Sequence, residues 1–307
     1  MRESNPTPAQ DASPQDLEEL PEILQGAPRR AGYQHLFVYE LADAWAVYFH
    51  HGKANEVGSA VLDELSKLTL ELESASGPQA LISLSARRSS KGRALFIAGA
   101  NVTERVGWSD DEVKAHVRRQ RALLRRLRRA PVFHVCIVSG VALGWGTEYL
   151  ITADYKLVTP EARFALPETG LGILPGAGGT SELAQLIGPA HALRLGMTGE
   201  QIDADEALRI GLAQERRESL DDALQRSLEL SSLVARKSPT ALAAFKRGLL
   251  DALGLEADER GELEARAYER CVESGEAAIG RRDFSLIRRG ETPNWGAKQL
   301  EDVDQSP

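Results

Sequence analysis

The sequence predicts an α/β protein whose mixed core is followed by a helical C-terminal region. Between residues 35 and 187, short apolar runs alternate with segments whose apolar residues recur at helical spacing. This alternation is typical of α/β domains in which helices cover the sheets. From about Gly188 onward almost every segment has the helical pattern. We therefore expect strands in the first two thirds of the chain and helices in the last third.

The predicted elements follow in order along the chain. The first two strands are separated by Ala42 and Asp43 alone, which predicts a hairpin. In the C-terminal region Ser238 is a predicted helix N-cap, with Pro239 at the first helical position. The expected strands of the core are 35–41, 44–50, 80–85, 94–99, 132–140, 155–159 and 163–166, and its expected helices include 57–73, 117–129 and 148–154.

Composition and charge exclude several classes of function. The net charge of -8 argues against nonspecific binding to nucleic acid or to an acidic membrane surface. No apolar run approaches the roughly 18 residues that a membrane span needs, so we expect no membrane partner. Residues 1–30 lack the pattern of a secretory signal and are rich in acidic, Pro and Ser residues. We expect them to form a disordered extension, and we expect a cytoplasmic location.

Two further features receive structural interpretations. Cys136 lies in an apolar run and Cys271 on a predicted helix, so neither predicts a disulfide or a zinc site, and no metal-ligand spacing is present. Residues 117–129 are densely basic. We interpret them as an amphipathic helix with a solvated cationic face; the alternative is an RNA-binding strip.

Three glycine-rich segments that follow predicted strands are candidates for chemistry. "FIAGAN" (96–101) ends a strand in small residues that leave backbone N–H groups free to face a ligand. "SGVALGWGTE" leads into a helix whose first N–H groups can stabilise an oxyanion, with Glu148 in the first turn. "FALPETGLGILPGAGGT" places Glu168 directly after Pro167. Two carboxylates from different elements can divide acid and base roles, although each segment alone also fits simple turn geometry.

Together these segments resemble the crotonase superfamily of enoyl-CoA hydratases and isomerases. The resemblance covers residues 39–215, with weaker similarity to about Trp295, and also includes "MTGEQIDADEALRIGLAQE". It implies a crotonase-like stacked ββα spiral core (31–215) and a helical trimerisation region (216–307). It further implies an acyl-CoA thioester substrate, assembly as a homotrimer or homohexamer, and no cofactor, because coenzyme A is part of the substrate.

The resemblance also assigns roles to individual residues. The N–H groups of Ala98 and Trp145 are expected to form the oxyanion hole around the thioester carbonyl. Glu148 is expected to act as general base on a water that attacks C3, and Glu168 to deliver a proton to C2. The residues expected to contact the substrate are Gly99, Ala100, Asn101, Lys53, Asn55, Gly144 and Pro167.

Departures from the family pattern leave alternatives open. Trp145 stands where a typical hydratase has glycine, and its indole either borders the acyl pocket or packs in the core. Asn101 replaces the usual Asp, which removes a charge near the site. The same fold also supports isomerisation, thioester hydrolysis and decarboxylation. The acyl group, and the choice between free coenzyme A and a carrier protein, are not determined by the sequence.

Overall fold

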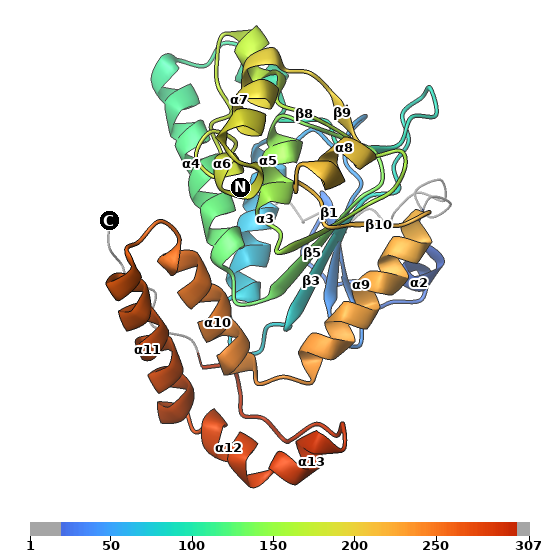
Figure 1. Ribbon diagram of the computed structural model, residues 1–307. Helices are drawn as coiled ribbons and strands as arrows, with labels where there is room; N and C mark the ends of the chain where they lie inside the picture. The colour runs from blue at the N-terminus through green and yellow to red at the C-terminus, as the bar shows by residue number, and fades with distance from the viewer. Residues whose placement is uncertain (1–19, 300–307) are drawn as a thin grey trace, which may run out of the picture.

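The structure, a computed structural model, describes residues 20–299 and contains two β-sheets there (Figure 1). In the larger sheet β1 and β2 pair antiparallel, and the remaining neighbours pair parallel. In the smaller sheet only the last pair is antiparallel. The larger sheet has the order β1 (Leu36–Glu40), β2 (Trp45–Phe49), β3 (Ala80–Leu84), β5 (Phe133–Val138), β7 (Tyr155–Val158), β10 (Glu215–Arg216), and the smaller has β4 (Leu95–Ile97), β6 (Val141–Leu143), β8 (Arg163–Ala165), β9 (Ile202–Asp203).

After the hairpin of β1 and β2, successive turns of the chain add one strand to each sheet. β3 joins the larger sheet, β4 joins the smaller one, and a helix follows; β5, β6 and the next helix repeat this path. The stacked ββα spiral predicted for the core is therefore confirmed. The helices are α2 (Glu22–Gln25), α3 (Ser59–Leu72), α4 (Asp110–Arg129), α5 (Trp145–Ile151), α6 (Leu183–Ile187), α7 (Pro189–Thr198), α8 (Ala204–Arg209), α9 (Leu220–Ala235), α10 (Pro239–Ala252), α11 (Ala257–Glu273), α12 (Glu276–Arg282) and α13 (Phe284–Arg288), with 3-10 turns η1 (Val102–Arg105) and η2 (Pro167–Leu171).

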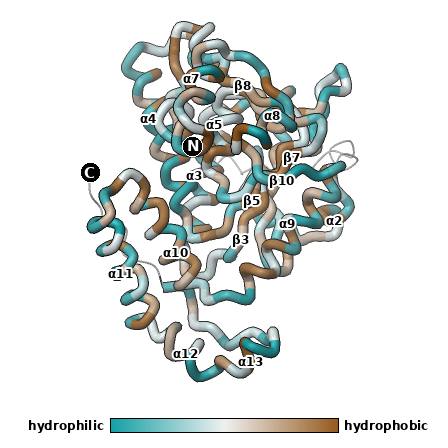
Figure 2. The backbone as a smooth tube through the Cα atoms, viewed as in Figure 1, coloured by the Kyte–Doolittle hydropathy of each residue, from teal (hydrophilic) through white to brown (hydrophobic). Residues whose placement is uncertain are grey.

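The larger sheet is buried on both faces. Leu36 and Val38 of β1 point into a core shared with α3, α4 and α5, whereas Phe37 and Tyr39 point to the opposite face, which α2 and α9 cover. This alternation is the period of two that a strand imposes on its side chains. Figure 2 shows hydrophobic stretches along the central strands β3 and β5.

Most strands and helices lie where the sequence predicts them. The hairpin across Ala42 and Asp43 is confirmed, and Ser238 caps α10 by accepting a hydrogen bond from the Ala241 N–H at 3.0 Å. The short strands β6, β9 and β10 were not predicted. β6 lies inside a segment interpreted as a glycine-rich turn, and β9 and β10 are two residues long, too short for a periodic pattern.

The extension predicted to be disordered, residues 1–30, was drawn too long at its C-terminal end. Residues 1–19 lie outside the described residues, but residues 20–30 pack on the core: Leu20 and Leu24 are buried beneath the larger sheet. The Arg30 N–H also donates to the Val38 carbonyl at 2.8 Å. Two leucines four residues apart are enough to anchor one helical turn, although the composition around them is polar.

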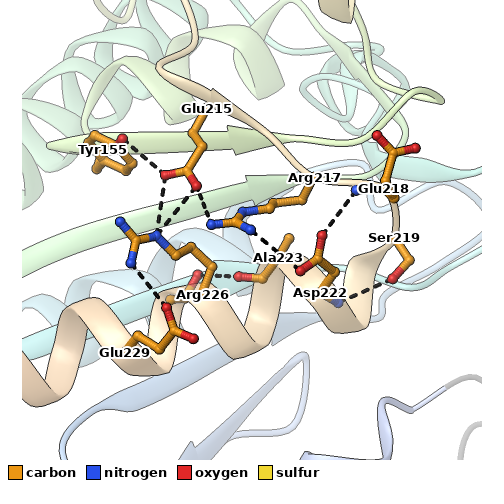
Figure 3. A network of polar contacts seen from close by, with 10 residues as sticks. Tyr155, Glu215, Arg217, Glu218, Ser219, Asp222, Ala223, Arg226 and Glu229 are labelled. Atoms are coloured by element: carbon orange, nitrogen blue, oxygen red, sulfur yellow. Dashed lines mark hydrogen bonds and ion pairs between the residues drawn. The ribbon is translucent and has the colours of Figure 1, made fainter.

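Helix α9 is held against the larger sheet by a network of ion pairs (Figure 3). Glu215 of β10 accepts a hydrogen bond from the Tyr155 hydroxyl at 3.1 Å and pairs with Arg226 of α9 at 3.4 Å. Arg217 links Glu215 to Asp222 of the same helix. The first helix of the predicted C-terminal region therefore belongs to the sheet packing.

Helices α10 to α13 extend away from the sheets, except where α10 returns to α4 (Figure 1). The Lys246 ammonium anchors α10 by donating to the Val132 carbonyl at 2.8 Å and to the Asp154 carboxylate at 2.7 Å. Within residues 20–299 no helix is both long and apolar enough to cross a membrane.

Candidate active site

The glycines around Trp145 are required by close contacts of the backbone. Gly144 has φ 49°, and a Cβ atom at this position would lie 2.6 Å from Oε1 of Glu168. A Cβ atom on Gly146 would lie 2.2 Å from the Ile97 carbonyl oxygen. Any larger residue at 144 or 146 would displace Glu168 or separate α5 from β4. The residue between these glycines has no such restriction and carries an indole.

The Trp145 side chain lies in the hydrophobic core. It is 2% exposed, and its ring is tilted by 30° against that of Tyr149 with 5.6 Å between the centroids. Its indole N–H finds no hydrogen-bond partner among the described residues. Of the two interpretations of this side chain, the structure favours packing in the core.

Glu148 is fixed by backbone donors from the loop before α6. Its Oε1 accepts hydrogen bonds from the N–H groups of Ala177 at 2.7 Å and Gly179 at 3.0 Å. Burial raises the pKa of Glu148, and the two N–H donors and the charge of Arg121 oppose this increase. The fold therefore provides specific stabilisation for the ionised form of Glu148.

Glu168 lies in η2, directly after Pro167, in an environment that stabilises its ionised form less than that of Glu148 does. It is 9% exposed, and its Oε2 has no hydrogen-bond partner among the described residues. Burial, together with the nearby charge of Glu148, raises the pKa of Glu168 to about 7. The structure thus brings both predicted carboxylates together and favours the proton on Glu168. Such a pair can supply a base and an acid at the same pH.

The prediction that Ala98 supplies an oxyanion donor is wrong. The Ala98 N–H donates to the Ala54 carbonyl at 3.0 Å and is not available to a ligand. Further along the same two segments, the Val57 N–H donates to the Gly99 carbonyl, and the Val57 carbonyl accepts from the Asn101 N–H. In this pairing the N–H of Ala100 points to the opposite side, and no described residue accepts a hydrogen bond from it.

The N–H of Trp145 is the second free donor of the site. Trp145 is the first residue of α5, and the first intrahelical hydrogen bond runs from the Glu148 N–H to the Gly144 carbonyl at 3.0 Å. The N–H groups before it have no partner within the helix. The N–H of Trp145 therefore stays a predicted oxyanion donor, whereas the predicted donor at Ala98 is already bonded and Ala100 has the unbonded N–H.

Asn55 has a structural role instead of the predicted contact with coenzyme A. Its buried amide Nδ2 lies within hydrogen-bond distance of the carbonyls of Phe49 and Phe96 and of the Ser85 hydroxyl, and its Oδ1 accepts from the His51 N–H at 2.8 Å. The side chain therefore has no polar atom left for a ligand. Lys53, two residues earlier, is exposed and stays a predicted contact.

Asn101 acts as a cap. Its Oδ1 accepts a hydrogen bond from the Thr103 hydroxyl at 2.7 Å and one from the Glu104 N–H at 3.3 Å, which begins η1. An aspartate can accept the same two bonds, so the replacement keeps the local turn while it removes a charge.

A cavity of about 320 Å³ opens beside Glu148, between α4, α5, the loop before α6, and α10. The arginines of α4 that line it were predicted to form a solvated face. Helical spacing gave the correct helix, and Arg121 and Arg125 are exposed as predicted, but the spacing did not show that α5 and α10 form a cavity with this face. The lining arginines are Arg121, Arg125, Arg128 and Arg129.

Comparisons with known proteins point to one family. Residues 89–292 match the family model described as enoyl-CoA hydratase/isomerase. A short-chain-enoyl-CoA hydratase of Clostridium acetobutylicum is 31% identical over 217 residues, which are 71% of this chain and 81% of the relative.

Solved structures show the same fold. An enoyl-CoA hydratase from Bacillus anthracis superposes with a TM-score of 0.77 at 26% identity, covering 85% of this chain and 99% of that structure. DspI from Pseudomonas aeruginosa gives a TM-score of 0.76 at 27% identity, covering 85% and 97%.

Proposed function

Because the chain belongs to the enoyl-CoA hydratase/isomerase family, the crotonase superfamily, we propose that it adds water reversibly to a 2-enoyl-CoA thioester. The observation that carries this proposal is the pair of buried carboxylates with different hydrogen-bond environments. Glu148 receives two backbone donors, whereas the pKa of Glu168 is raised to about 7. Hydration requires one ionised and one protonated group at the same site.

The thioester carbonyl is held by the free N–H groups of Ala100 and Trp145. Each such donor, when it is aimed at the developing oxyanion, typically contributes about 3 kcal/mol to the transition state. Both are backbone groups, so the departure from glycine at position 145 leaves this function intact. The donor from Ala100 replaces the one that the sequence assigned to Ala98.

The reaction divides into two proton transfers. Water attacks C3 through its oxygen and gives one proton to the Glu148 carboxylate, while the electrons of the double bond move to the thioester oxygen. The resulting enolate takes a proton at C2 from Glu168. Water is thereby added across the double bond, and the two glutamates exchange their protonation states through solvent before the next turnover.

The competing reactions of this fold use fewer of these groups. Isomerisation, thioester hydrolysis and decarboxylation all need the oxyanion donors, but none needs two carboxylates in these two environments. The RNA-binding alternative is weakened, because four of the seven arginines in residues 117–129 line the cavity beside Glu148, and Arg119 and Arg126 pair with Asp63 and Glu73. A scaffold without activity has no use for either carboxylate.

Assembly as a homotrimer or homohexamer is part of the same proposal. Large apolar side chains are exposed on the C-terminal helices, including Phe245 on α10 at 72%, Tyr268 on α11 at 70% and Phe284 on α13 at 60%. Such side chains are suited to subunit contacts. Size-exclusion chromatography with light scattering tests this, and a monomer at micromolar concentration would contradict it.

The first experiment is a spectrophotometric assay of the conjugated enoyl thioester. Hydration removes its absorbance, and we expect turnover with trans-2-enoyl-CoA substrates and losses of at least about 100-fold in Glu148→Gln and Glu168→Gln. Activity should fall at low pH as Glu148 is protonated, and above about pH 7 as Glu168 loses its proton. A different product from the same substrates would instead identify a competing reaction.

A further inference from the structure

The proposed reaction directs the acyl chain past Glu148, the one catalytic carboxylate that lines the cavity. In the proposed reaction Glu148 acts on the water at C3, so the carbons beyond C3 lie next to its carboxylate. Glu148 lines the cavity of about 320 Å³, together with Leu124 of α4 and Ile151 of α5. Leu250 and Leu253, at the end of α10, close its far side. These apolar side chains suit a chain of methylene groups.

The same cavity has an excess of positive charge. Of its four arginines, Arg128 forms an ion pair with Glu182 and Arg129 forms one with Asp251. Arg121, which is exposed, donates its Nε–H to the Gly176 carbonyl at 2.7 Å and forms no ion pair with a described residue. Arg125 makes no hydrogen bond or ion pair with any residue from 20 to 299.

These two unpaired guanidinium groups lie on one face of α4. Arg121 and Arg125 are four residues apart, a spacing at which like charges destabilise a helix by a few tenths of a kcal/mol. Arg121 is also close enough to Glu148 for its charge to oppose the increase that burial causes in the pKa of that carboxyl group. A guanidinium group binds a carboxylate through two parallel hydrogen bonds. An anion bound between Arg121 and Arg125 would therefore reduce the repulsion between their charges and accept hydrogen bonds from their unused N–H groups.

We propose that the preferred acyl group carries a carboxylate at its distal end, which Arg121 and Arg125 bind in the cavity beside Glu148. This inference rests on the proposed hydration, because that reaction sets the direction of the acyl chain. The substrate class is then a 2-enoyl-CoA with a second, terminal carboxylate. The apolar residues of the cavity surround the intervening carbons.

Matched substrates test the inference. Pairs of trans-2-enoyl-CoA thioesters with chains of about five to eight carbons would be compared, one ending in a methyl group and one in a carboxylate. We expect kcat/KM to be at least about tenfold higher for the carboxylate member of at least one pair, the size of effect of one charge-assisted hydrogen bond. A preference for the methyl member in every pair, or equal kcat/KM in every pair, overturns the inference.

The variant Arg125→Met tests the site directly. It keeps the length and apolar stem of the side chain, and it is expected to abolish the preference for the carboxylate while kcat/KM for the methyl substrate changes by less than about twofold. The matched control is Arg126→Met on the same helix, because Arg126 donates its Nε–H to Glu73 at 2.7 Å and does not line the cavity. An equal loss for both substrates in Arg125→Met would mean that Arg125 binds the phosphates of coenzyme A, and this result overturns the inference.

Binding of saturated analogues separates this inference from the proposed function. Calorimetric titration with adipyl-CoA and hexanoyl-CoA compares the same chain length with and without the carboxylate, and requires no turnover. Tighter binding of adipyl-CoA that Arg125→Met removes supports the inference even if no enoyl thioester is hydrated. Hydration of neutral substrates without selective binding leaves the proposed function in place and overturns the inference.

Discussion

Replacing Glu168 with glutamine removes a buried carboxyl group whose ionisation the fold opposes. Burial and the charge of Glu148 raise the pKa of Glu168 from 4.5 to about 7. A group that holds its proton more tightly in the folded state contributes stability that is fully present below the unfolded pKa and is lost as pH rises through the folded pKa. The wild type should therefore become less stable, relative to Glu168→Gln, as pH rises from 4.5 to 7.

The magnitude follows from the two pKa values. At about 1.36 kcal/mol per pKa unit, the difference between 4.5 and about 7 sets an upper limit of about 3 to 4 kcal/mol. Glu168 keeps some contact with solvent, at 9% exposed, and solvent weakens the interactions of a charged group, so we expect about 2 kcal/mol.

The assay is equilibrium urea denaturation at about pH 5, close to the unfolded pKa, and at about pH 8.5, above the folded pKa. The free energy of unfolding of Glu168→Gln, relative to that of the wild type, should be about 2 kcal/mol larger at about pH 8.5 than at about pH 5, so the variant gains stability over the wild type as pH rises. Glu218→Gln is the control, because Glu218 is 82% exposed and its replacement should change stability by less than about 0.5 kcal/mol at either pH. The same stability difference for Glu168→Gln at both pH values would refute the reasoning.

Three further substitutions test individual residues of the site. Gly144→Ala places a Cβ atom 2.6 Å from the Glu168 carboxylate at a positive φ, so kcat/KM should fall by at least about tenfold and stability by about 1 kcal/mol; an unchanged kcat/KM would show that Glu168 can move freely. Asn55→Ala leaves two buried carbonyls without their donor, so urea denaturation should show a loss of about 2 to 3 kcal/mol with little change in KM. A raised KM at full stability would instead mean that Asn55 binds coenzyme A. Trp145→Phe should lower stability by about 1 to 2 kcal/mol without altering the preference for acyl chain length, and a shifted preference would place the indole at the pocket.

Most strands of the core and the start of α10 could be predicted because each is marked by residues adjacent in the sequence. The strands from β1 to β8 that were predicted are continuous runs of apolar residues, and α10 begins at a serine followed by proline. The short strands were missed because two or three residues carry no periodicity. Leu20 and Leu24 were missed because their burial depends on strands that follow them in the chain.

The sequence by itself determined which residue types meet at the site. Two glutamates, a glycine-flanked helix start and a strand ending in small residues were all identified from their order along the chain. These features depend on side-chain chemistry and on backbone geometry within a few residues, both of which the sequence displays directly. Only the fold shows why residues 144 and 146 must be glycine: a Cβ atom there would clash with Glu168 and Ile97.

Tertiary structure alone decided which of these groups are free to act. The Ala98 N–H is occupied by the carbonyl of Ala54, which leaves Ala100 as the available donor. Hydrogen bonds to distant backbone likewise place the side chain of Asn55 inside the protein. Four of the seven arginines of α4 line a cavity because α5 and α10 pack beside that helix. Hydrogen bonds, burial and charge depend on distances between segments far apart in the chain, and only folding sets those distances.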